Sequence, residues 1–200
     1  MAVTLNASTS SGFIQSADTS GTLQLQSNGT TQQTIDSTGS YGQLKSGTAV
    51  ASTSGTSIDF TSIPSWVKRI TVMFDAVSTN GSSIPQVQLG TSGGVQTTSY
   101  VSYLLSNTVT NSNTAGFSLN AAANQSASTQ IYGALMLSLL NSATGQWAAS
   151  WSLGVNAAGA VGVVGGGSKT LSGTLDRIRI TTVNGTDTFD AGSINILYEG

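Results

Sequence analysis

The fold class follows from residues 146–153, whose sequence is QWAASWSL. The apolar residues Trp147, Ala149, Trp151 and Leu153 stand at every second position, with small or polar residues between them. Side chains of a β-strand point alternately to its two faces, so a period of two predicts a strand with one buried face. The same period recurs in four other segments: Ile58 and Phe60; Ile70, Val72, Phe74 and Ala76; Ile178 and Ile180; and Ile194, Ile196 and Tyr198.

Glycine-containing turn signals separate these segments, as expected for strands that reverse direction. They are Asn80-Gly81, Ser92-Gly93-Gly94, Thr144-Gly145, Gly165-Gly166-Gly167 and Asn184-Gly185. We interpret residues 162–170 as a glycine-rich turn between strands, because Ser168 stands where a phosphate-binding loop has the glycine before its lysine. Residues 46–200 are therefore predicted to form an all-β head, an antiparallel, jelly-roll-like β-sandwich of about eight strands.

Residues 1–45 form a different block, with short apolar islands such as Leu5, Phe13-Ile14 and Ile35 between turn signals. The segment 23–26, LQLQ, alternates as a half-buried strand does. These strands are too short and sparse to bury a core of their own. We expect an extended, β-rich attachment and oligomerisation segment that is stable only against its own copies, the head or a docking protein.

Charge excludes several classes of partner. Only 7% of the residues are charged and the net charge is −2, whereas ordinary soluble domains have about 25% charged residues. The six basic residues are scattered, so the clusters that displace counterions from nucleic acid are missing. The longest apolar run, residues 135–140, is too short to span a bilayer. We expect no nucleic-acid binding, no membrane insertion and no secretory signal.

The residues that carry catalysis are scarce. The chain has no cysteine and no histidine, which removes thiol nucleophiles and the usual base of a serine triad. Lys45, Lys68 and Lys169 do not stand in a Ser-x-x-Lys pattern. Asp187 and Asp190 are the closest acidic pair, and we interpret them as part of a solvated turn rather than as a Ca²⁺ site or a glycosidase pair. We expect no catalytic residue, no metal and no cofactor.

The three tryptophans have two interpretations. Trp147 and Trp151 share the face of Ala149 and Leu153, which favours a place in the core. The alternative is a platform on which a sugar stacks, and it requires exposed rings. Trp66 follows Pro64 at a strand entrance and fits either interpretation. Trp66, Trp147 and Trp151 are therefore the candidate glycan contacts.

Residues 131–140 are ambiguous between helix and strand. Ile131, Leu135 and Leu139 fit a helical stripe, but Gly133 and the turn signal Thr144-Gly145 favour a strand.

Such a strand would be apolar on both faces, with Leu135 and Leu137 on one and Ala134 and Met136 on the other. A strand covered on both sides in so polar a chain suggests subunit contact. Leu135, Met136 and Leu137 are therefore the candidate subunit-interface strand. No heptad run is present, so a coiled coil is not expected to hold the subunits together.

Five segments resemble those of tail-fibre and related virion proteins of tailed phages. They are residues 58–74, IDFTSIPSWVKRITVMF; 77–81, VSTNG; 87–90, VQLG; 94–98, GVQTT; and 187–199, DTFDAGSINILYE. The resemblance spans most of residues 46–200 and implies a trimeric phage particle component with a β-sandwich head. It carries no catalytic signature. Tail fibres are often long, so the short block before the head is a departure that leaves a complete small fibre, a fragment and a capsid-decorating protein open.

We therefore expect a non-enzymatic virion protein on the particle surface, a homotrimeric fibre or spike subunit joined to another virion protein by its N-terminal segment. The alternatives are a capsid decoration protein without a receptor role and a lectin-like module that binds host surface polysaccharide. In the last case the loops at one end of the sandwich would carry the contact, for example 78–84, 106–116 and 184–192.

Overall fold

The computed structural model describes residues 23–27, 30–36, 39–40, 44–157 and 159–200. The chain divides into two compact units, Met1–Gln43 and Leu44–Gly200. The second unit therefore begins two residues before the predicted boundary after residue 45. The reason is backbone pairing, because Leu44 and Lys45 lie opposite Glu199 and Tyr198 in the sheet of the head.

The first unit contains a three-stranded antiparallel sheet. Its strands, in spatial order, are β1 (Leu23–Ser27), β2 (Thr30–Asp36) and β3 (Gly39–Ser40). The strand predicted at residues 23–26 is confirmed, and its register against β2 shifts after the pair Leu25–Gln33. Leu25 is exposed. Leu5 and Phe13-Ile14, which belong to the same predicted block, lie outside the described residues.

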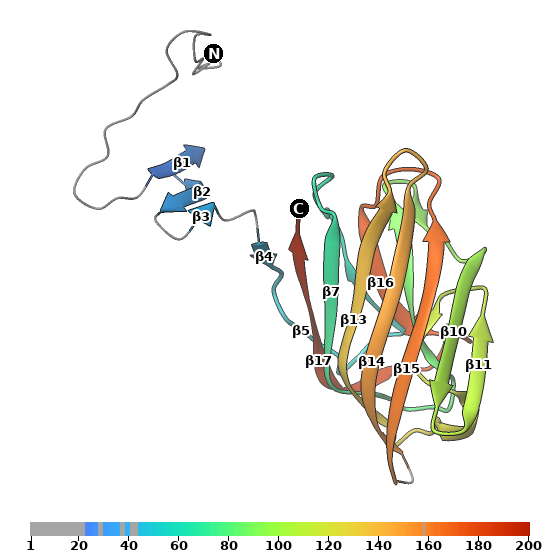
Figure 1. The fold of residues 1–200 in the computed structure, drawn as a ribbon. Coiled ribbons are helices and arrows are strands. Elements are labelled where there is room, and N and C mark those ends of the chain that lie inside the picture. The colour runs from blue at the N-terminus through green and yellow to red at the C-terminus, as the bar shows by residue number, and fades with distance from the viewer. Residues whose placement is uncertain (1–22, 28–29, 37–38, 41–43, 158) are drawn as a thin grey trace, which may run out of the picture. The chain divides into compact units, whose positions relative to one another are not determined.

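The second unit is an antiparallel β-sandwich of two sheets, as predicted (Figure 1). The nine-stranded sheet contains β4 (Leu44–Ser46), β5 (Val50–Ala51), β7 (Arg69–Thr79), β10 (Tyr100–Ser106), β11 (Val109–Asn113), β13 (Gln130–Asn141), β14 (Gln146–Ala157), β15 (Gly159–Thr170) and β17 (Phe189–Glu199). The five-stranded sheet contains β6 (Ser57–Phe60), β8 (Pro85–Thr91), β9 (Gly94–Val95), β12 (Phe117–Ser118) and β16 (Arg177–Thr182). A single 3₁₀ turn, Ala122–Asn124, interrupts the described strands.

The order of the large sheet is β11-β10-β15-β14-β13-β7-β17-β4, with β5 also paired to β17, and that of the small sheet is β12-β8-β16-β6, with β9 on β8. The chain crosses between the sheets after most strands, which is the winding that a jelly-roll-like sandwich requires. The departure is the run β13-β14-β15, three consecutive strands that stay neighbours in one sheet (Figure 1). The ambiguous segment at residues 131–140 is therefore a strand, and it pairs with both β14 and β7.

The predicted alternation places the core between the sheets. Trp147, Ala149, Trp151 and Leu153 are all buried, and so are the alternating isoleucines of β16 and β17. Burying apolar surface at roughly 25 cal/mol per Å² is the main force that holds two such sheets together.

Ala76 departs from the predicted face. It has a φ of +52°, a left-handed conformation that alanine adopts at an energetic disadvantage. The registers of β7 with both neighbours shift here, so Val77 takes the buried position instead. Glycines with positive φ flank this β-bulge on each side, Gly133 in β13 and Gly192 in β17. A Cβ atom on Gly192 would lie 2.4 Å from the carbonyl oxygen of Ala76, so the bulge requires glycine there.

The interpretation of residues 162–170 as a turn is wrong. They lie within β15, a strand paired along its length with β14 and also with β10. The inward-facing glycines are explained by close packing: a Cβ atom on Gly165 would lie 2.2 Å from Cε2 of Trp151, and one on Gly167 would lie 2.1 Å from the carbonyl oxygen of Val101. Glycine in a strand interior here marks a close approach rather than a chain reversal.

Candidate functional site

The two predicted acidic turn residues have structural partners. Asp187 accepts hydrogen bonds from the backbone N–H of Ser83 at 2.9 Å and from the side-chain amide of Asn184 at 2.7 Å. Asp190 accepts one from the hydroxyl of Ser78. Asp187 therefore ties the connection at Ser83 to the bend at Asn184, within two of the loops that the sequence offered as receptor contacts. Asp190 instead lies in β17 and contacts the neighbouring strand β7, so its interpretation as a turn residue is wrong. Among the described residues, no group of three or more acidic side chains could hold a metal ion.

The candidate glycan contacts differ in exposure. Trp147 and Trp151 are only 3% and 4% exposed, so they occupy the core, the interpretation that their spacing favoured. Neither ring is an exposed platform, although the small accessible part of Trp147 lines a pocket at one end of the sandwich. Phe117 packs on Trp151 with ring centroids 6.0 Å apart. Trp66 is half-buried and lies 5.9 Å from the ring of Tyr198, centroid to centroid. Of the three rings, Trp66 is the most exposed.

The candidate interface residues divide between the two faces of β13. Leu135 and Leu137 are completely buried against the five-stranded sheet side of the core, whereas Met136 is 42% exposed on the outer face. The alternation that the sequence predicted is therefore present, but its two leucines stabilise the subunit itself. Only Met136 of these three can contact another molecule.

The outer face of the large sheet bears an apolar ridge along β10. We call Val101, Tyr103, Leu105 and the adjacent Val164 of β15 the β10 ridge. All four are exposed, Tyr103 to 65%, and the registers Tyr103–Gly166 and Leu105–Val164 place them side by side. Exposed apolar side chains that gather in this way, rather than singly, mark interaction surfaces.

Small residues lie beside this ridge on the outer face of β14 and β15, with Val164 between the two glycines of β15. We call Ser150, Ser152, Gly154, Gly162 and Gly166 the small-residue floor. Gly154 pairs with Gly162, and Ser150 pairs with Gly166. Met136 lies next to Ser150 on the far side. The strands that carry the ridge, the floor and Met136 are β10, β15, β14 and β13, which are neighbours in the large sheet (Figure 1). The three features therefore lie on one side of four adjacent strands.

The glycines of the floor are not required by the subunit. A Cβ atom on Gly154 or Gly162 would meet nothing within 4 Å, and one on Gly166 would lie at an ordinary 3.6 Å from the carbonyl oxygen of Ala149. None of the three has a positive φ. The ring of Tyr103 does not cover Gly166 either, although the two residues are cross-strand neighbours. These positions therefore differ from Gly165 and Gly167, which the core requires.

This face is also free of charge. The four neighbouring strands β10, β15, β14 and β13 contain a single charged residue, Lys169, and its side chain faces the core. Lys169 is 5% exposed; its Nζ donates a hydrogen bond to the carbonyl oxygen of Thr98 at 2.9 Å and lies 5.1 Å from the ring centroid of Tyr100. Burial lowers the pKa of Lys169, because desolvation disfavours the ammonium.

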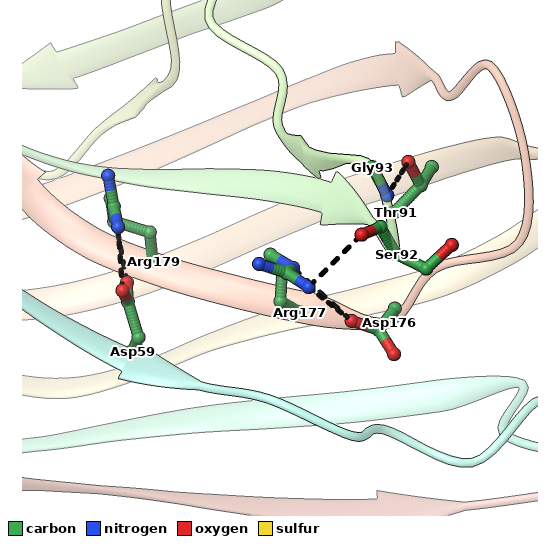
Figure 2. Close-up of polar contacts among 7 residues, drawn as sticks. All are labelled: Asp59, Thr91, Ser92, Gly93, Asp176, Arg177 and Arg179. Carbon is green, nitrogen blue, oxygen red and sulfur yellow. Dashed lines mark hydrogen bonds and ion pairs between the residues drawn. The ribbon is translucent and has the colours of Figure 1, made fainter.

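The outer face of the small sheet has the opposite character (Figure 2). Arg179 of β16 holds Asp59 of β6 with two hydrogen bonds, Nε to Oδ1 at 2.7 Å and Nη2 to Oδ2 at 2.6 Å. These bonds raise the pKa of Arg179. Arg177 binds Asp176 and also donates to the carbonyl oxygen of Ser92 at 3.5 Å. Two charged pairs thus lie on the outer side of β6 and β16.

Sequence reasoning found the strands of the large sheet but missed the face they build. Tyr103 alternates with Val101 and Leu105 in the sequence, and that pattern was the available signal for a second apolar face. No comparable sequence pattern indicated the small-residue floor, because glycine in a sequence usually indicates a turn rather than a strand.

Within the described residues, no helix is long and apolar enough to cross a membrane. Comparison with protein families, with curated proteins and with solved structures found no match to this chain.

Proposed function

We propose that the protein is a structural subunit of a phage particle, a homotrimeric fibre or spike subunit that displays its β-sandwich on the particle surface. In this proposal the heads associate through the outer face of the nine-stranded sheet, and residues 1–45 attach them to another virion protein. The protein has no catalytic role.

The observation that carries the proposal is the small-residue floor. Glycine inside a strand destabilises it by roughly 0.5–1 kcal/mol relative to alanine. Gly154 and Gly162 bear that disadvantage although the subunit has room for a side chain at both. Strand glycines without an internal reason mark places where another backbone or ligand approaches closely. A second copy of the head provides such a neighbour.

The β10 ridge of one copy is a suitable surface to pack against the small-residue floor of another copy. Its apolar side chains project beside a strip that has almost none, and neither surface carries charge. When the ridge of one copy lies on the floor of the next, the contact is heterologous, and repeating it around a three-fold axis closes a ring. Burial of Tyr103 at the centre of such a contact would make it a dominant residue, since buried tyrosines carry much of the energy of interfaces.

The composition supports a role outside the cell. The head has no thiol and no imidazole, so neither redox state nor pH near neutrality changes its charge at those groups. All three arginines, Arg69, Arg177 and Arg179, are paired with acidic residues within the described structure. The fold thus depends little on the ionic conditions of its surroundings.

The test is to image particles labelled with an antibody against residues 44–200. Label on the tail is expected for a fibre or spike. Label on the capsid favours the decoration protein, which uses the same contact between heads. Particles without label contradict the proposal. Deletion of residues 1–43 is expected to leave a folded head that no longer incorporates into particles, and normal incorporation would place the attachment elsewhere.

A further inference from the structure

A pocket of about 300 Å³ opens at one end of the sandwich. Three connections build it: residues 64–68 before β7, the turn 142–145 between β13 and β14, and residues 171–175 between β15 and β16. The backbone N–H of Leu171 donates to the carbonyl oxygen of Gly145 at 3.0 Å, which joins two of these segments. None of them belongs to the loops that the sequence offered as receptor contacts.

The floor of the pocket is apolar and its rim is polar. Val67, Trp147, Leu171 and Leu175 line it with side chains that are otherwise buried in the core. The rim carries the hydroxyl groups of Ser65, Ser142, Thr144 and Thr174. None of these hydroxyl groups is hydrogen-bonded to another of the described residues, although the backbone N–H of Thr144 donates to Asn141. An apolar base with a few converging polar groups is the usual constitution of a small-molecule site, and 300 Å³ is near the lower end of the range, about 300–1,000 Å³.

Lys68 gives this pocket its charge. The arginines are paired with acids and Lys169 is held by a carbonyl oxygen, whereas Lys68 and Lys45 have no carboxylate partner in the described residues. Only Lys68 of these two lines the pocket, and no acidic residue lines it. The backbone of Lys68 is fixed by two hydrogen bonds of 2.8 Å, one donated to Glu199 and one accepted from Leu139. The backbone of Lys68 is therefore held at the rim, and its exposed side chain extends from there.

We propose that this pocket binds a carboxylated monosaccharide, a uronic acid unit. The ammonium group of Lys68 pairs with the carboxylate, the free rim hydroxyls bond the sugar hydroxyls, and the apolar base receives the C–H face of the ring. The volume of the pocket admits about one such ring. This site goes beyond the proposed structural role and does not depend on the trimer.

The test is saturation-transfer difference NMR on the full-length protein, with D-glucuronate and D-glucose as paired probes and sodium acetate as the charge-only probe. We expect transfer to glucuronate that exceeds transfer to glucose and that acetate at equal concentration does not abolish. Lys68→Gln is expected to weaken glucuronate binding about fivefold, the contribution of one exposed ion pair. Its side chain is exposed, so the fold should not change.

Lys45→Gln is the matched control, since Lys45 is also an exposed, unpaired lysine but does not line the pocket. It is expected to bind glucuronate as the wild type does. The proposal is contradicted by an absence of transfer to glucuronate, by equal transfer to glucose, by complete displacement with acetate, or by equal effects of the two lysine variants. A trimer that binds no glucuronate would refute this site alone, and a monomer that binds it would refute the proposed assembly alone.

Discussion

The two outer faces of the sandwich are both built from antiparallel strands but differ in the charge of their outward side chains. On the five-stranded sheet, Arg179–Asp59 and Arg177–Asp176 cover the face with charge (Figure 2). On the nine-stranded sheet, four adjacent strands present apolar and small side chains with no outward charge. A sheet face that carries charged pairs is stable in contact with water, whereas an uncharged apolar face is typical of a surface that binds another molecule. This contrast is the basis on which we propose a subunit contact for the uncharged face and solvent for the charged one.

The two faces of β15 repeat this contrast within one strand. Its inward glycines, Gly165 and Gly167, make room for Trp151 and for the backbone at Val101. Its outward glycines, Gly162 and Gly166, make room for nothing in this chain. Glycine therefore occurs in β15 for two different reasons, which substitution at the inward and outward positions can distinguish.

The largest effect on folding is expected from filling the inward space. Gly165→Val places a side chain where Trp151 lies, and we expect it to lower the free energy of unfolding by about 3 kcal/mol. Gly162→Val is the matched control on the outer face, and it should change the stability of the isolated subunit by less than about 0.5 kcal/mol. Urea denaturation of both variants under conditions that dissociate the wild-type assembly measures the difference. Equal losses would remove the distinction between the two faces.

The next largest effect is expected from placing charge on the outer face. Tyr103→Arg should weaken association of the heads by about 2 kcal/mol or more, about 30-fold, because a buried, unpaired guanidinium replaces a central aromatic residue. Val183→Arg is the control, an exposed apolar residue in the bend after β16. Sedimentation equilibrium measures the association constant of both variants. Unchanged association of Tyr103→Arg would place the contact on another surface.

A smaller effect is expected at the inward tyrosine of the same strand. The hydroxyl of Tyr100 accepts a hydrogen bond from the N–H of Leu89 at 2.6 Å and donates one to the carbonyl oxygen of Gln96 at 2.9 Å. Tyr100→Phe removes both, so we expect a loss of about 1–2 kcal/mol at pH 7.

This loss should depend on pH. Burial raises the pKa of Tyr100 above its ordinary value, although the bond from Leu89 opposes the rise. The raised pKa stabilises the folded wild type at pH values below about 10, which is the pKa of tyrosine in the unfolded chain. This contribution decreases as the pH rises from about 10 toward the pKa of Tyr100 in the folded protein. The stability gap between wild type and Tyr100→Phe should therefore narrow from pH 9 to pH 11. Both proteins retain Lys169, so its titration cancels in the comparison. A constant gap would contradict the burial of this hydroxyl.

The smallest effect is expected on the charged face. Arg179→Ala removes a half-exposed ion pair with Asp59, and such pairs contribute about 0–1 kcal/mol. We expect a loss of unfolding free energy in that range that decreases further in 1 M salt, together with unchanged association. Weaker association of this variant would mean that the five-stranded sheet also contacts a neighbour.

The sequence predicted the fold better than the surface. Period-two alternation identified the buried sides of β7, β14, β16 and β17, because burial between two sheets acts on every second residue. It failed at Ala76, where a bulge shifts the register, and at residues 162–170, where glycine serves packing. Spacing also could not tell that Leu135 and Leu137 face the core while Met136 faces outward, since both faces of β13 are apolar. The pocket around Lys68 is formed by three segments that are far apart in the sequence, so no local sequence pattern could predict it.

The mass of the intact, wild-type protein in solution tests the proposed trimer most directly. Light scattering at micromolar concentration is expected to give three times the chain mass of 20.2 kDa, because we propose that neighbouring copies cover the uncharged outer face of β10, β15, β14 and β13. A single species with the mass of one chain would show that this face needs no second copy, and would contradict the assembly proposed here.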